Sequence, residues 1–203
     1  MQSATSDVDG RLAKAIVAID AANSDDPFTL VVDGVEHPKE MVHAELMTEW
    51  VLRLDPGATE AQLIAARAHH LRRWALPRQD YPEGRSGYLR WRTTLKKQHA
   101  EEVGAILAQV GYDPGTIERV QQIVRKEGLG RDPQVQVHED ALCLVFLQTQ
   151  LDNVAGQLGD DKAVDVLRKT ARKMSQNGLA AASELPLTDT GRRLVEAALA
   201  GGS

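Results

Sequence analysis

The sequence Ala141-Leu-Cys-Leu-Val-Phe-Leu147 decides the fold class of this chain. It lies inside the stretch from about 136 to 158, which follows Pro133 and which we predict to be a helix. Seven consecutive apolar residues cover every side of a helix, and a helix that is apolar all round is buried. The stretch therefore predicts a central core helix. It contains Cys143, the one cysteine of the chain, which excludes an internal disulfide and indicates a small core residue.

Amphipathic segments lie on both sides of this central helix along the chain. Val42, Leu46, Trp50 and Leu54, for example, repeat every four residues, as the residues of one helix face do. Similar patterns and capping residues predict helices over residues 11–23, 39–54, 59–74, 87–110, 114–128, 160–175 and 188–200.

One segment, residues 28–37, has the composition of β-structure. It contains a β-branched run, and Asp33-Gly34 is a dipeptide that favours a two-residue hairpin turn. We therefore expect an all-α fold with a single helical domain over residues 11–200. One small β-hairpin lies near the N-terminus, at about 28–37, and residues 1–10 form a flexible N-terminal segment.

Length and composition indicate a soluble globular protein. The 203 residues are 42% hydrophobic and 26% charged, which is ordinary for one domain with a full core. The net charge of -5 argues against a protein that coats DNA, because non-specific nucleic-acid binding depends on positive charge. No apolar run is as long as a membrane span requires, and the polar, acidic start is unlike a signal peptide. We expect a cytoplasmic location and no membrane partner.

The segment from Leu71 to Ala100 has a different composition. It contains eight basic residues against Asp80 and Glu83, and it holds half of the aromatic residues of the chain. Guanidinium groups bind phosphate with two hydrogen bonds, and aromatic faces stack on bases. The segment predicts a site for a small phosphorylated ligand such as a nucleotide, or for a short stretch of RNA. The alternative is a solvated, arginine-rich helix face with core aromatics.

Histidine and carboxylate residues recur on separate predicted core helices. Helical bundles build metal sites by projecting such side chains from facing helices into one pocket, and imidazole with carboxylate suits a first-row transition metal. His37 and His138 lie at the edges of predicted elements and are expected to be solvated. The candidates on core helices are His43, His70, His99, Glu139 and Asp140.

The order of these residues resembles the HD superfamily of all-α, metal-dependent phosphohydrolases. The resemblance implies that His43 is the first metal-binding histidine, His69-His70 the family's His-Asp pair and Asp140 its late aspartate. The chain departs from the pattern because the pair is His-His, so the Asp that helps to bind the metal is missing. Either His70 replaces that Asp, or His70 is the ligand and His69 its neighbour.

A closer resemblance covers about residues 15–199 and involves an uncharacterised family, catalogued as a domain of unknown function. Some of its members are labelled glutamyl-tRNA synthetase, a label that the absence of βαβ alternation does not support. The site that this resemblance implies contains His70, Arg73, Trp74, Arg78, Arg85, Arg92, His99 and Asp140. The segments that carry the resemblance are Ile19–Asn23, His70–Trp74, Pro77-Arg78, Tyr81-Pro82, Gly84–Tyr88, Trp91-Arg92, His99-Ala100, Asp132-Pro133, Glu139-Asp140 and Cys143–Leu147.

Three interpretations follow. The first is an HD-like phosphohydrolase with a divalent metal ion, acting on a nucleotide or another phosphate ester. Its metal ligands are His70, His99 and Asp140, with His43 as a fourth candidate, and Glu139 is the catalytic base or an acceptor for a ligating imidazole. Its substrate-binding residues are Arg73, Arg78, Tyr81, Arg85, Tyr88 and Arg92. The second is an HD-like module without catalysis that binds nucleotide or RNA in the same pocket. The third is a structural protein whose histidines belong to the core.

Overall fold

The computed structural model describes the backbone of residues 2–200 and the side chains of residues 10–200. It confirms the all-α class: 73% of the chain is helical, and the described residues form one small hairpin. The α-helices are α1 (Gln2–Asn23), α2 (Lys39–Leu54), α3 (Glu60–Arg67), α4 (Gly84–Val110), α5 (Pro114–Arg125), α6 (Pro133–Thr149), α7 (Leu151–Leu158), α8 (Asp160–Ala171), α9 (Gln176–Ser183) and α10 (Asp189–Ala200).

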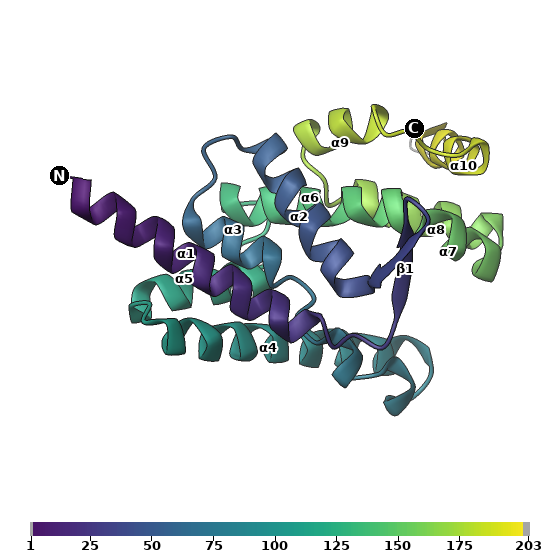
Figure 1. The fold of residues 1–203 in the computed structure, drawn as a ribbon. Helices are drawn as coiled ribbons and strands as arrows, with labels where there is room; N and C mark the ends of the chain where they lie inside the picture. The colour runs from purple at the N-terminus through teal and green to yellow at the C-terminus, as the bar shows by residue number, and fades with distance from the viewer. Residues whose placement is uncertain (1, 201–203) are drawn as a thin grey trace.

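The helices pack in layers around α6 (Figure 1). The long helix α4 lies along one side of the molecule, α9 and α10 lie along the opposite side, and α2, α3 and α6 lie between them. Helix α6 contacts α2, α3, α5 and α9, and Ala141 and Leu144 are fully buried. The predicted central core helix is therefore confirmed. Within the described residues, no helix is both long and apolar enough to cross a membrane.

The hairpin pairs β1 (Thr29–Val32) with β2 (Val35–Pro38) in antiparallel register. Asp33 and Gly34 both have positive φ, at 51° and 81°, as a two-residue turn of the predicted kind requires. The hairpin leads directly into α2 and contacts it. It thereby fixes the start of the helix that supplies two residues of the site described below.

The helix predicted over residues 59–74 ends earlier than expected. Thr59 caps it as predicted, in a capping box with Gln62, but α3 stops at Arg67. The chain then turns through Arg72, whose φ of 49° is left-handed, into the 3-10 turn η1 (Arg73–Ala75). Adjacent residues of an α-helix point about 100° apart. The turn instead brings the neighbouring rings of His69 and His70 together, with centroids 4.1 Å apart, in the interior.

Several other helices also differ from the prediction. Helix α1 begins at Gln2 rather than Arg11, so the expected flexible segment 1–10 includes its first turns, and Met1 lies outside the described residues. The helix predicted over 136–158 begins at Pro133 and breaks at Gln150, which has non-helical backbone angles. Helix α9 was not expected, because its eight residues are too few for a periodic signal.

The loop before α4 is folded against that helix. Arg78, in the 3-10 turn η2 (Arg78–Asp80), donates hydrogen bonds to the carbonyls of Tyr81 (2.8 Å) and Pro82 (3.0 Å). A side chain at Gly87, in the first turns of α4, would overlap the carbonyl of Pro82. The close approach that this glycine allows packs Pro82 against the first turns of α4.

Candidate functional site

Glu40, His43 and His70 form a buried cluster at the junction of α2 and the turn after α3. Glu40 and His43 are three residues apart and therefore share a face of α2. The Oε2 atom of Glu40 lies 3.1 Å from Nδ1 of His43 and 3.0 Å from Nδ1 of His70. One ligand atom from each of the three residues lies within 4.8 Å of the others.

The protonation of the cluster follows from its geometry. Burial raises the pKa of Glu40, but His70 and His43 outweigh this effect and hold it well below its usual value. The carboxylate is therefore ionised and can only accept hydrogen bonds, so both Nδ1 atoms carry a proton. Burial, together with Arg73, lowers the pKa of His70 to about 3, so its ring is neutral. Arg73 Nη1 lies 2.9 Å from Nε2 of His70 and donates to it.

The donor set fits a divalent metal ion. One carboxylate and two imidazoles are typical ligands of zinc and of first-row transition metals. At bond lengths of about 2.0–2.2 Å, two ligands at right angles on one ion lie about 3 Å apart. The observed separations of 3.0 and 3.1 Å are those of hydrogen bonds and are close to this value, whereas a tetrahedral ion such as zinc would widen them to about 3.4 Å. An ion held by Glu40, His43 and His70 would take the place of the two imidazole protons.

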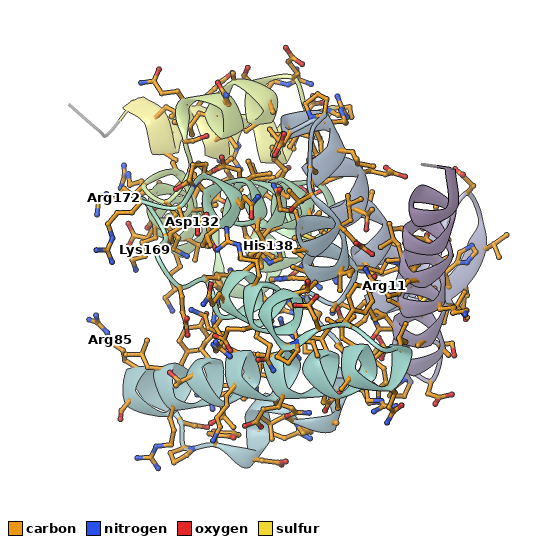
Figure 2. All side chains as sticks on the ribbon, turned by 90° about the vertical axis from the view of Figure 1, so that its left-hand side faces the viewer. Arg11, Arg85, Asp132, His138, Lys169 and Arg172 are labelled. Atoms are coloured by element: carbon orange, nitrogen blue, oxygen red, sulfur yellow. The ribbon has the colours of Figure 1, made fainter. Side chains whose placement is uncertain are left out.

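Further histidines surround the cluster without joining it. Nδ1 of His99 donates to the carbonyl of Leu71 (2.8 Å), and burial lowers the pKa of His99 to about 4. His69 Nδ1 lies 3.0 Å from His138 Nε2. The other ring nitrogens of that pair, His69 Nε2 and His138 Nδ1, are buried and have no hydrogen-bond partner within the described part of the chain. The expectation that His138 is solvated is therefore wrong, because its side chain projects from α6 into the interior of the molecule (Figure 2). His37 is exposed, as predicted.

Asp140 is held elsewhere by its own hydrogen bonds. Its carboxylate accepts from the N–H (2.8 Å) and O–H (2.5 Å) of Ser175, the N-cap of α9, and from Gln136 Nε2 (3.0 Å). A side chain at Gly178 would overlap this carboxylate, which shows how closely α9 packs on it. The structure thus places Asp140 at the start of α9 and not in the cluster, where Glu40 supplies the carboxylate.

Glu139, the predicted base, belongs to a buried ion-pair network. Its Oε2 lies 2.5 Å from Nζ of Lys126, and its Oε1 lies 3.7 Å from Nζ of Lys173. Burial raises the pKa of Glu139, but the two lysines outweigh this effect and lower it overall. Burial also lowers the pKa of Lys126 to about 8. Two ammonium groups therefore compensate the Glu139 carboxylate.

Three other cations form no such direct ion pair with any described residue, and one of them, Arg73, contacts His70 of the cluster. We call Arg73, Arg92 and Lys96 the cation group. None of them has a carboxylate within 4.0 Å among the residues that the structure describes. Burial lowers the pKa values of Arg73 and Lys96, and the positive charge of Arg92 adds to this effect. The Glu40 carboxylate opposes the shift of the Arg73 pKa, and the Glu139 carboxylate opposes that of the Lys96 pKa. The guanidinium of Arg73 lies over the Trp91 ring (5.2 Å). The three positive charges of the cation group are therefore suited to binding an anion.

The remaining predicted substrate residues are distributed around this group. Arg92 donates from Nη1 to the Tyr88 hydroxyl (3.1 Å), so Tyr88 lies beside the cation group. Arg78 is engaged with the loop carbonyls described above, and Tyr81 supplies one of them. Arg85 is exposed and extends outward from the first turns of α4 at the edge of the molecule in Figure 2. Of the predicted set, Arg73, Tyr88 and Arg92 come together.

The comparison with known proteins shows the family. Residues 13–195 match a family described as "Domain of unknown function (DUF4202)". The chain belongs to this family. Its matched region contains the whole Glu40–His43–His70 cluster and the cation group. No curated protein and no solved structure matches the chain.

Sequence reasoning missed Glu40. The available signal was the Glu40-x-x-His43 spacing, which puts both side chains on one helix face and recurs in the metal sites of helical bundles. It was not recognised because the preceding Pro38-Lys39 marks the start of the helix, and a carboxylate in a first helical turn is usually explained by the helix dipole. Its burial, at 4% exposed, reveals the difference.

Proposed function

We propose that the protein is a metal-dependent phosphohydrolase-like protein that acts on a nucleotide or another phosphate ester. Glu40, His43 and His70 would hold the divalent ion, and the cation group would hold the phosphate. The observation that carries this proposal is the contact between the two parts. Arg73 reaches His70 in the cluster with one hydrogen bond of 2.9 Å, and its pKa responds to the charge of Arg92.

The protein groups suggest how a phosphate ester would be bound. A divalent ion in the cluster would lower the pKa of a bound water molecule and polarise a phosphoryl oxygen. Arg73 and Arg92 present planar guanidinium groups, which bind phosphate oxygens in pairs and stabilise charge that develops on them. Tyr88 is 42% exposed next to Arg92, so its ring is available to stack on a base. The HD resemblance supports the same assignment for His43 and His70, with Glu40 as the acidic ligand in place of Asp140.

One observation favours a second candidate, a module that binds nucleotide or RNA without catalysis. The Glu40 carboxylate already accepts both imidazole protons, and Arg73 already donates to His70. Nδ1 of His43 and both ring nitrogens of His70 therefore already have hydrogen-bond partners, and the cluster could serve to position Arg73 for an anion. For either candidate we propose a cytoplasmic location, which the single buried thiol of Cys143 supports.

Phosphate release distinguishes the candidates. A panel of nucleotides and p-nitrophenyl phosphate is assayed with manganese, cobalt or magnesium. We expect turnover that falls at least about 100-fold in His70→Ala, because one of the three residues that would hold the divalent ion is lost. Arg92→Ala should weaken substrate binding by about 1.5–3 kcal/mol, as expected for a charge-assisted contact.

Lys97→Ala is the matched control. Lys97 lies on α4 beside Lys96, and its side chain is 74% exposed, so its removal should change neither quantity. Nucleotide binding that depends on Arg92, with no phosphate release under any of the three metals, would favour the binding module. The absence of both nucleotide binding and phosphate release would contradict both candidates.

A further inference from the structure

The contact between Arg73 and His70 bears on how the proposed metal and phosphate sites communicate. A guanidinium group has N–H donors and no acceptor, and it keeps its proton in proteins. At 2.9 Å from Nη1 of Arg73, Nε2 of His70 must therefore present its lone pair. The single proton of the neutral ring is on Nδ1, where Glu40 accepts it. Both ring nitrogens of His70 thus have hydrogen-bond partners, and the partner of Nε2 is the positively charged Arg73.

A metal ion cannot bind His70 while Arg73 stays in this position. An ion on Nε2 would occupy the place of the guanidinium. An ion on Nδ1 would move the ring proton to Nε2, where it would face the N–H of Arg73, donor against donor. In both cases the positive charge of Arg73 would also repel the ion at short range. Metal binding at His70 therefore requires Arg73 to turn away.

The groups on the other side of Arg73 show what could draw it away. Its guanidinium lies over the ring of Trp91, which is next to Arg92 in α4. The positive charge of Arg92 acts on Arg73 unfavourably. Among the described residues, no hydrogen-bond acceptor on that side competes with His70 for the Arg73 guanidinium in the absence of an anion. A phosphate group between Arg73 and Arg92 would reverse this balance, because it neutralises their repulsion and offers several acceptor oxygens.

We infer that a phosphate-bearing ligand bound between Arg73 and Arg92 withdraws Arg73 from His70 and so makes His70 available to the metal ion. This inference rests on the proposed function, because it assigns the two sites named there. The metal ion and the phosphate ligand then bind cooperatively, and Arg73 is the positioning residue that links the two sites. Linkage requires the effect to be reciprocal: each ligand increases the affinity for the other by the same factor.

The test uses cobalt(II) as the metal and methylphosphonate as a phosphate group that cannot be hydrolysed. The absorption of bound cobalt reports its affinity. In the unmodified protein, saturating methylphosphonate should raise the cobalt affinity about tenfold or more. In Arg73→Met, which has no donor and no charge, cobalt should bind more tightly without methylphosphonate, and methylphosphonate should no longer change its affinity.

Two controls make the result specific. Lys97→Met removes an exposed charge of α4 and should keep the full coupling. Association of cobalt with methylphosphonate in solution would change all variants equally. The reciprocal measurement, methylphosphonate affinity with and without cobalt, needs no variant and should give the same factor in the unmodified protein.

Failure of the coupling and failure of the metal site would give different results. If cobalt binds the unmodified protein and methylphosphonate leaves its affinity unchanged, the coupling is wrong and the metal site stands. If cobalt binds neither the unmodified protein nor Arg73→Met, the metal assignment itself is wrong and the coupling fails with it.

Discussion

Replacing Lys126 by Met should destabilise the protein by about 3 kcal/mol, because the Glu139 carboxylate would remain buried without its nearest partner. The Lys126 and Glu139 side chains are 6% and 3% exposed, so water cannot compensate the loss. Lys173 would remain, at 3.7 Å and 47% exposed, which keeps the expected loss at the lower end for a broken buried pair. Urea unfolding gives the free energy of unfolding directly.

The double variant Lys126→Met/Glu139→Leu tests the cause. With both charges removed, no unpaired ion remains in the core, and most of the lost stability should return. Lys97→Met is the control for loss of a lysine, since its ion pair with Glu101 is exposed and should contribute less than about 1 kcal/mol. A loss in Lys126→Met no larger than that in Lys97→Met would show that the buried pair does not stabilise the fold.

Acidification below pH 6.5 should destabilise the protein. This loss of stability should begin at pH values well above the range in which carboxylates titrate. Burial lowers the pKa values of His70 and His138 to about 3 and that of His99 to about 4, from the ordinary value of 6.5, and it lowers the pKa of His69 as well. Between pH 6.5 and about 4 the unfolded chain therefore binds more protons than the folded one. Stability is complete above pH 6.5 and decreases as the pH falls, by about 1.4 kcal/mol per pH unit for each histidine kept neutral.

Substitution identifies the groups responsible. With a chelator present throughout, His99→Gln should reduce the slope of stability against pH between 6.5 and 5 by about one proton. His37→Gln should leave the slope unchanged, because His37 is exposed on the hairpin. The measurement is urea unfolding at half-unit steps of pH. A stability that is constant between pH 7 and 5 would contradict the neutral, buried state of these histidines.

The parts of the fold that local chemistry determines were predictable from the sequence. The Asp33-Gly34 turn needs two positive φ angles, and Asp113 before Pro114 is a strong helix start; both lie where expected. The end of α3 was not predictable, because Ala68–Arg72 has no helix-breaking residue. Long-range packing ends the helix there: His69 meets His138 of α6, and the Arg72 N–H donates to Asn23 of α1.

The site was predictable only in residue types. His43 and His70 were identified as ligands and lie together, whereas Asp140 is used by Ser175 and Gln136, which sequence spacing cannot reveal. Which of two buried carboxylates reaches a histidine depends on the direction of each side chain from its helix. That direction is set by packing between helices far apart in the sequence. For this reason Glu40, and not Asp140, contacts His43 and His70.

The metal content of the protein tests the central claim most directly. The unmodified protein and Glu40→Gln are purified without chelator and analysed for metals, with Glu45→Gln as the matched control on an exposed position of α2. We predict about one equivalent of zinc or of a first-row transition metal per chain in the unmodified protein and in Glu45→Gln, and a content near zero in Glu40→Gln. Equal metal content in all three proteins, or none in any of them after saturation with zinc, manganese and cobalt, would contradict a metal centre at Glu40, His43 and His70.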